Sequence, residues 1–396
     1  MIESLSGTKL LSPRLRAAKA FTLVELMVSM TIIVLLMVML VQMTNSTSQL
    51  WRRTTGKVEQ FRAAREGFES MTRQLGQATL NTYWDYNDAN NPTKFVRQSE
   101  LRFASGPIMT GTKPLNSSPS GAQQWPFHGV FFFAPSGYDI ASKTTTDPLN
   151  DTSLSTLLNV CGYYVEFNTD HAYAPQFLQN VITDRYRFRL MEMKAASRDV
   201  NIYSHTSSAT SPVNLTYQQK DWFTPYMVNP GVGMRTSFAA LPVRILAENV
   251  VALIILPRLS SQEELSRKTN GKKPLCPDYH YDTTYDRSNS AYPYSDPETN
   301  PTNQLPPVVQ VVMVAIDEPS ALRWAAINGT TMPSLGSSDL FADSTKLFDL
   351  NGNPDKGDLA VFEQYLTQQK LTYRVFSSAV AIKAAKWSRQ QVESGS

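Results

Sequence analysis

The segment from Phe21 to Met43 constrains this chain more than any other part of its sequence. It reads FTLVELMVSMTIIVLLMVMLVQM and contains one charged residue, Glu25. A helix of about 20 apolar residues crosses the hydrocarbon core of a bilayer, which is about 30 Å thick. A secretory signal has a shorter apolar region, of about 7 to 15 residues, followed by a small-residue cleavage site. The sequence therefore predicts a membrane-spanning helix.

Glu25 lies about one helical turn inside this apolar segment. A lone carboxylate is costly in hydrocarbon, so an acid within a membrane helix is by default a functional residue with a partner. The membrane segment has no Lys, Arg or His within one turn of Glu25. We expect the partner to come from another chain or from a newly formed N-terminal amine. The alternative is a side chain near the interface that reaches water by itself.

The positive charge of the chain is concentrated at its start. The first 20 residues have a net charge of +3, which equals the formal charge of all 396 residues. The remainder is therefore neutral and shows no basic excess that would indicate a nucleic-acid surface. A hydrophobic content of 42% and an aromatic content of 10% are enough for a substantial buried core.

The residues around the start of the apolar segment carry a family resemblance. The sequence KAFTLVE (19–25) follows a short basic leader and precedes about 18 apolar residues. It resembles the class III signal of type IV pilins and type II secretion pseudopilins. The resemblance implies that a prepilin peptidase cleaves between Ala20 and Phe21 and methylates Phe21, and that Glu25 then pairs with a neighbouring subunit's amine during filament assembly. The family usually has Gly where this chain has Ala20.

The same resemblance implies how the chain is organised. Residues 1–20 are expected to be a leader in the cytoplasm and residues 21–43 the transmembrane half of a long helix in the inner membrane. Residues 44–80 are expected to form its amphipathic half, and residues 81–396 a periplasmic globular domain. The amphipathic half also follows from the residues, because apolar side chains recur there at spacings of three or four: Val58, Phe61, Ala64, Phe68, Met71 and Leu75.

Strand-like runs dominate the rest of the chain. They are rich in β-branched and aromatic residues and cover residues 129–134, 162–167, 186–193, 249–256, 308–316 and 371–382, with a shorter run around 95–103. Helical patterns cover residues 358–370 and a shorter stretch at 319–327. We predict an α+β fold of pilin-like architecture, in which the long N-terminal helix packs on a mainly antiparallel sheet with long loops.

Two regions read as loops. Residues 81–126 are rich in Asn, Pro, Ser, Thr and Gly, and residues 260–307 form a long irregular insertion without a periodic apolar face. The second region is either a surface insertion or a partner-binding loop, and the sequence leaves both alternatives open.

A second, looser resemblance covers the later part of the chain. The order YRFRLMEM, LAENVVALIILPRL, LPPVVQVVMVAIDEP resembles the strand order of larger minor pseudopilins of the J type. The final YRVFSSAVAIKAAKWS resembles the tail of the pilin-like family Verru_Chthon cassette protein C.

The sequence offers little support for catalysis. The four histidines, His128, His171, His205 and His280, are dispersed, and the chain has no H-E-x-x-H, G-x-S-x-G or P-loop pattern. Two cysteines are too few for a four-thiolate zinc site or an iron–sulfur cluster. We therefore expect no enzyme activity and no resident cofactor.

Two patterns leave alternatives open. Cys161 and Cys276 form either one disulfide, if the domain lies outside the cytoplasm, or a buried thiol and a free one. Within FDLNGNPDKGD (348–358), oxygen donors alternate as in the first half of a calcium loop, at Asp349, Asn351, Asn353 and Asp355. The glycine expected at position six is Pro354 and the acid expected at position twelve is Ala360. A turn followed by a capped helix explains the same residues without metal.

Taken together, these features predict a non-enzymatic minor pilin or pseudopilin subunit placed near the tip of its filament. Its expected partners are prepilin peptidase, other pilin or pseudopilin subunits and the inner membrane, and no nucleic acid. The alternative is a single-pass, membrane-anchored periplasmic binding or adhesion module that does not enter a filament.

Overall fold

The structure is a computed structural model. It describes residues 22–86, 90–93, 95–108, 126–137, 158–175, 177–178, 181–196, 223, 243–284, 297–337, 340–349 and 353–387. Contacts between residues divide the chain into two units, Met1–Gly56 and Lys57–Ser396. We call the second unit the head.

The first element is the helix α1 (Leu23–Leu75), which continues through both units. The predicted long helix is confirmed, although it ends at Leu75 and not near residue 80. Within the head, α1 buries an apolar stripe of Ala64, Phe68, Met71 and Leu75, which recur at the spacing of one helical face.

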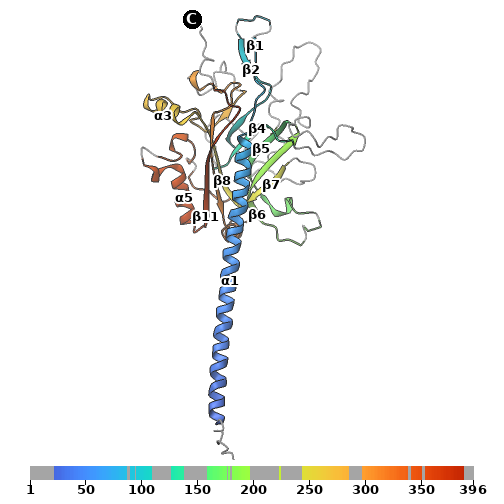
Figure 1. The fold of residues 1–396 in the computed structure, drawn as a ribbon, viewed down its shortest axis with the longest axis vertical. Coiled ribbons are helices and arrows are strands. Elements are labelled where there is room, and N and C mark those ends of the chain that lie inside the picture. Colours follow the sequence, from blue (N-terminus) through green and yellow to red (C-terminus); the bar gives the residue numbers. More distant parts are fainter. Residues whose placement is uncertain are drawn as a thin grey trace, which may run out of the picture. The chain divides into compact units, whose positions relative to one another are not determined.

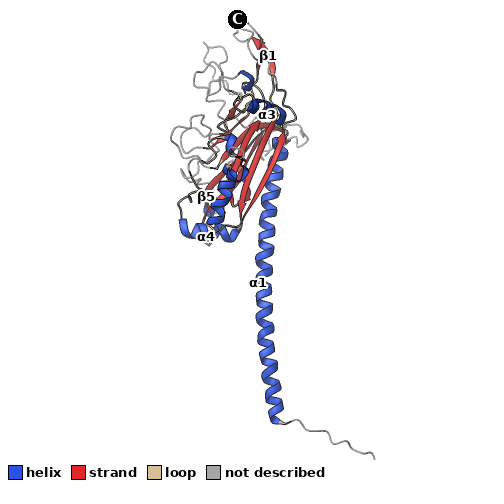
Figure 2. Ribbon diagram, turned by 90° about the vertical axis from the view of Figure 1, so that its left-hand side faces the viewer, coloured by secondary structure: helices blue, strands red, loops and turns tan. Residues whose placement is uncertain are grey.

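This stripe packs on strands that come from distant parts of the sequence. The Phe68 ring lies 5.9 Å from the ring of Phe376, and Gly67 lies so close to Leu246 that a Cβ atom there would be 3.3 Å from its side chain. Figure 1 shows this part of α1 in front of the strands, and Figure 2 shows that the strands lie along one side of it. The C-terminal part of α1 is therefore a component of the head's core.

The largest sheet has six strands in the order β7-β6-β5-β4-β3-β9, and every neighbouring pair is antiparallel. Its strands are β3 (Ala104–Pro107), β4 (His128–Pro135), β5 (Leu158–Thr169), β6 (Tyr186–Ala196), β7 (Val243–Glu248) and β9 (Tyr281–Asp282). A second antiparallel sheet has the order β11-β10-β8, formed by β8 (Val250–Arg258), β10 (Val308–Ile316) and β11 (Tyr373–Ala381). A separate two-stranded sheet pairs β1 (Tyr83–Tyr86) with β2 (Phe95–Gln98).

Asn249 is the corner between the two larger sheets. It separates β7 from β8 and has a φ of 60°, in the left-handed region that Asn tolerates better than most residues. Its backbone N–H donates to Phe188 O in β6 (2.8 Å), and its carbonyl accepts from Ile316 N in β10 (2.9 Å). One residue thus transfers the chain from the six-stranded sheet to the three-stranded sheet.

Apolar side chains fill both faces of the six-stranded sheet. On one face, Val130, Phe132 and Ala134 of β4 join a core shared with α1, β8 and β10. On the other face, the alternate residues Phe131 and Phe133 join a second cluster, which includes Tyr164, Met191, Met193 and Phe223.

Three shorter helices complete the described head: α3 (Ser261–Thr269), α4 (Glu318–Asn328) and α5 (Asp358–Gln368). In Figure 2, α3 and α4 lie at opposite ends of the sheets. Asp317 caps α4 by accepting a hydrogen bond from Ser320 N. Phe362 and Leu366 of α5 are buried in the main core.

The structure corrects two expectations. The insertion at 260–307 is not irregular throughout, because α3 forms at its start, closed by a capping box between Ser260 and Glu263. This helix buries Arg267 in place of an apolar stripe, so hydrophobic periodicity could not reveal it. The strand expected around 95–103 is shorter: β2 ends at Gln98, and β3, which begins at Ala104, belongs to a different sheet. The α+β class and the mainly antiparallel pairing are confirmed.

Candidate functional site

The N-terminus of α1 is the candidate functional site, and it is built by Thr22 and Glu25. The Glu25 carboxylate accepts hydrogen bonds from Thr22 N and Thr22 Oγ1, each at 3.0 Å. In return, Glu25 N donates to Thr22 Oγ1 at 3.3 Å. These reciprocal bonds form a capping box, with Thr22 as N-cap and Glu25 as the third helical residue. The helix dipole also favours a carboxylate in the first turn.

The sequence reasoning identified Glu25 but missed its local partner. The signal was present as Thr-x-x-Glu immediately before an apolar run. The predicted cleavage residues Ala20 and Phe21 lie outside the described part of the chain. The capping box therefore begins one residue after the predicted mature N-terminus, and Glu25 lies in the first turn of the helix.

Beyond Glu25, α1 is compatible with a membrane. Residues Leu23–Trp51 form a 29-residue stretch long and apolar enough to cross a bilayer, and its large apolar side chains are exposed to the surroundings. Four of its hydroxyl groups bond to the helix itself: Ser29, Thr31, Thr44 and Thr47 donate to backbone carbonyls three or four residues earlier. Such internal pairing is what hydrocarbon requires of polar groups. Glu25 is the one charged residue in this stretch.

The two cysteines are buried free thiols in the structure, so the predicted alternative of a disulfide between them is not formed. Cys161 lies on β5, where its sulfur accepts a hydrogen bond from Gln74 Nε2 of α1 at 3.7 Å. Burial raises the pKa of the Cys161 thiol to about 12, and burial likewise raises the pKa of Cys276 well above its ordinary value. Both thiols are therefore packing residues with little thiolate character.

The predicted calcium loop is described in part. Asn353 accepts a hydrogen bond from Asp355 N at 3.1 Å and so caps a short turn (Pro354–Lys356). Gly357 is then the N-cap of α5, whereas Asn351 lies outside the described residues. Among the residues that the structure describes, no group of three or more His, Cys, Asp and Glu side chains is arranged to hold a metal ion. Calcium binding remains a prediction, while the capping role of Asn353 is a feature of the structure.

The described histidines have structural surroundings. His128 is fully buried, and its Nδ1 accepts a hydrogen bond from Ile255 N at 3.0 Å. Burial lowers the pKa of His128 to about 4, against a smaller opposing effect of the Ile255 backbone. His171 bonds to the carbonyl of Ile182 at 3.0 Å, and His280 is buried. His205 lies outside the described residues. The described histidines thus do not converge on one site.

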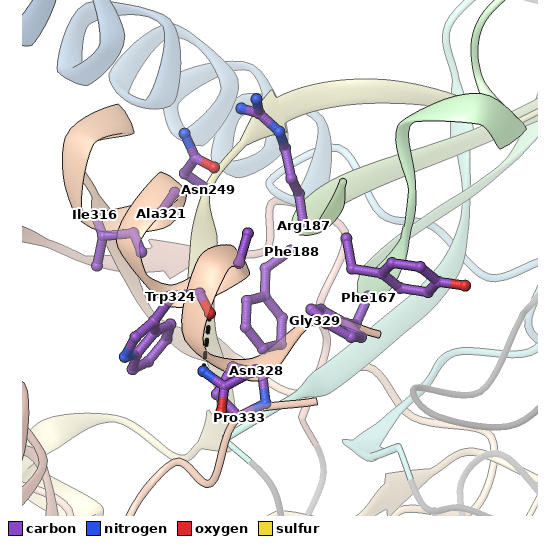
Figure 3. A pocket seen from close by; sticks show the side chains of 12 residues that line it. Phe167, Arg187, Phe188, Asn249, Ile316, Ala321, Trp324, Asn328, Gly329 and Pro333 are labelled. Atoms are coloured by element: carbon purple, nitrogen blue, oxygen red, sulfur yellow. Dashed lines mark hydrogen bonds between the residues drawn. The ribbon is translucent and has the colours of Figure 1, made fainter. Parts of the chain in front are cut away.

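Figure 3 shows a pocket between α4 and the strands β5 and β6. Its walls are aromatic, formed by Phe167, Phe188 and Trp324, and Arg187 and Asn249 lie at one end. The cavity volume is about 20 Å³, which accommodates about one water molecule. This pocket is too small for an organic substrate.

A larger open groove of about 550 Å³ lies beside β6, and its lining includes three arginines, Arg185, Arg187 and Arg189, and two acids, Asp170 and Glu248. The Arg187 guanidinium contacts Asp170 at 3.3 Å and Glu318 at 2.6 Å. Arg189 is buried, pairs with Asp170, and donates to Asn168 O at 2.8 Å. These ion pairs hold β6 to its neighbours and engage the charges of Arg187 and Arg189 locally.

Comparisons with known proteins point to the same end of the chain as the capping box. Residues 15–41 match the family model described as the prokaryotic N-terminal methylation motif. Neither the curated proteins nor the solved structures give a match. The motif is the signature of type IV pilins and pseudopilins, whose precursors are processed by prepilin peptidase and whose mature forms are structural subunits. The chain therefore carries the N-terminal signature of a type IV pilin-like precursor, on an apolar helix that leads into an α+β head.

Proposed function

We propose that this protein is a non-enzymatic minor pilin or pseudopilin. Prepilin peptidase removes residues 1–20, the apolar part of α1 is held in the inner membrane, and the head lies in the periplasm. The mature subunit then joins a type IV pilus-like filament or a type II secretion pseudopilus. The observation that carries this proposal is the position of Glu25, a lone acid held in the first turn of an apolar helix inside the matched motif.

Cleavage before Phe21 would create an amine one residue ahead of the N-cap Thr22. In the isolated chain, the Glu25 carboxylate is satisfied by Thr22. In a bundle of apolar helices, a positively charged amine from a neighbouring subunit offsets the cost of burying this carboxylate. Glu25 thereby favours a specific stagger between neighbouring helices, because the ion pair forms only when one helix start lies beside the first turn of the next.

The size of the head supports a minor role near the filament tip. The head unit extends from Lys57 to Ser396, and its described residues include the C-terminal part of α1, two larger sheets, a hairpin and the helices α3, α4 and α5. A body of this size on every subunit would crowd a helical lattice. A subunit at the tip has no neighbour beyond it, so its head avoids this steric conflict on that side.

The first test is the N-terminus of the full chain after co-expression with a prepilin peptidase. Intact mass and N-terminal sequencing are expected to show a chain that begins at methylated Phe21. A chain that retains residues 1–20 beside an active peptidase would contradict the proposal. It would instead support a membrane-anchored periplasmic module.

The second test separates assembly from processing. Glu25→Gln keeps the length of the side chain and removes its charge, so we expect normal cleavage but incorporation into sheared filaments reduced by about tenfold or more. Ser29→Ala is the matched control, because Ser29 lies one turn later and bonds only to the Leu26 carbonyl among the interactions described for it. Equal incorporation of the Glu25→Gln variant and the wild type would refute the pairing role of Glu25.

A further inference from the structure

The hairpin formed by β1 and β2 presents an unusual surface. It is a two-stranded sheet of its own, apart from the two larger sheets, and Figure 2 shows β1 beyond their ends. Its register pairs Trp84 with Arg97 and Tyr86 with Phe95. Because side chains alternate along a strand, these four residues share one side of the hairpin. We call this side the aromatic face.

The three rings of the aromatic face are largely open to solvent. Trp84 is 63% exposed, Tyr86 50% and Phe95 62%. Large rings contribute much of the apolar burial in protein cores, so several exposed together on eight strand residues are more informative than single exposed side chains. Neither core cluster of the head includes them. Their retention at the surface is therefore not explained by folding.

The aromatic face is held in a defined arrangement. The Tyr86 and Phe95 rings stack with centroids 4.7 Å apart and an interplanar angle of 28°. The Arg97 guanidinium lies 5.6 Å from the centre of the Trp84 ring. It also donates to Gln304 Oε1 at 3.3 Å and to the carbonyl of Lys386 at 3.2 Å. The hairpin is thus anchored to the head through Arg97, and a preorganised surface loses less entropy on binding a ligand.

The charge on the face argues against an anionic partner. Arg97 is its one cation, and the guanidinium is already bonded to the head. Asp85, which adds an acid to the hairpin, lies on the opposite side in the register. Binding to anionic lipid or nucleic acid relies on several lysines or arginines that face the partner. The aromatic face instead suits a neutral ligand.

The area of the face argues against a stable protein partner. A standard protein interface uses about 800 Å² and roughly 20 residues on each side, whereas the two strands contain four residues each. A pyranose ring needs far less area. It presents a flat face of C–H groups that stacks on an aromatic ring, while its hydroxyl groups remain available for hydrogen bonds at the edge.

From this geometry we propose that the aromatic face binds a neutral polysaccharide chain, with sugar rings stacked on Trp84 and on the Tyr86–Phe95 pair. This site is separate from the proposed assembly function. Its test needs no filament, so either proposal can fail without the other.

The test is cosedimentation of the full chain, in detergent, with three insoluble neutral probes: chitin, cellulose and a β-1,3-glucan. We expect binding to at least one probe, and the probe that binds identifies the sugar and linkage that the aromatic face accepts. Trp84→Ala combined with Tyr86→Ala should weaken binding by about tenfold or more. Raising the salt concentration from roughly 50 to 500 mM should leave binding unchanged, because no ion pair is involved.

Two controls make the result specific. Tyr83→Ala removes an exposed ring from the opposite side of the same hairpin and should bind as the wild type does. Phe177→Ala removes an exposed ring elsewhere in the head and should also have no effect. The hairpin variants should unfold at the wild-type temperature, since their rings lie outside both cores.

Three results would overturn the proposal. One is the absence of binding to all three probes. Another is equal loss of binding in the Tyr83→Ala control. The third is salt-sensitive binding to phosphatidylglycerol vesicles that is abolished by the same double substitution, which would assign the face to a membrane surface.

Discussion

His128 should make the head sensitive to acid, because the folded chain holds its imidazole neutral in the core. It is fully buried on β4, where its Nδ1 accepts a hydrogen bond from Ile255 N. Its ring packs edge-on against the Tyr279 ring, with the two ring centroids 4.9 Å apart. Protonation would place a charge in this apolar region, and a hydrogen bond from the protonated Nδ1 to Ile255 O, 3.2 Å away, would offset only part of the desolvation cost. The perturbation is therefore a fall in pH through the range in which free histidine becomes charged.

The magnitude follows from the two pKa values of His128. Burial lowers its pKa to about 4 in the folded chain, against an ordinary value of 6.5. The unfolded chain binds the proton more tightly, so stability falls as the pH drops from 6.5 to about 4 and changes no further from this cause below that. At about 1.36 kcal/mol for each pKa unit, the full loss is about 3 kcal/mol. Above pH 6.5, His128 contributes no pH dependence.

The assay is urea unfolding of the full chain in detergent, followed by near-ultraviolet circular dichroism of the head at several pH values. Other carboxylates also respond to acid, so the quantity to compare is the change in unfolding free energy between about pH 7 and pH 4 in wild type and variants. His128→Phe and His128→Leu remove the titrating group. Both should start less stable and then lose about 3 kcal/mol less than the wild type over this range.

One result would refute this reasoning. If wild type and both variants lose the same free energy between these two pH values, His128 does not titrate differently in the folded and unfolded chains. Two variants of different size separate this outcome from a packing defect, because a packing defect shifts stability equally at each pH.

Two further substitutions test the backbone of the head. Asn249→Ala should lower the unfolding free energy by about 1 to 3 kcal/mol, because φ is 60° there and the side chain donates to Glu318 at 2.9 Å. Asn249→Gly should lose less stability, because glycine adopts this φ without strain. Equal losses of the two variants in thermal unfolding would contradict the backbone argument. Gly357→Ala should cost about 1 to 3 kcal/mol, because its Cβ would lie 2.6 Å from the Phe348 backbone. Gly76→Ala, whose Cβ would meet Val380 at an ordinary 3.5 Å, is the matched control in denaturant unfolding, and equal effects of the two would count against the steric reason.

Elements with a strong local pattern were predictable from the sequence. The run VVQVVMVAI predicted a strand at 308–316, and β10 covers Val308–Ile316. The helix predicted from residue 358 begins there as α5. Such segments bury a continuous or periodic apolar surface, so their composition indicates their structure before any partner is known.

Elements that depend on distant partners were not predictable in this way. The helix α3 buries the charged side chain of Arg267, which is held by Glu298 at 2.9 Å and by the carbonyl of Lys273 at 2.9 Å. A buried arginine gives no hydrophobic signal. The division into two sheets was not predictable either. The turn at Asn249 is favourable only when β6 and β10 supply its backbone hydrogen-bond partners, and these strands are distant in the sequence.

The sequence by itself determined the membrane-compatible helix, the place of the lone acid Glu25 in its first turn and the α+β class, because these depend on the local order of apolar and polar residues. The tertiary structure alone decided which strands form which sheet, that Cys161 and Cys276 are separate buried thiols, and that Trp84, Tyr86 and Phe95 share one exposed face. These properties arise from pairing between residues far apart in the chain or on different strands. No short stretch of sequence contains the partner that fixes their burial, pKa or exposure.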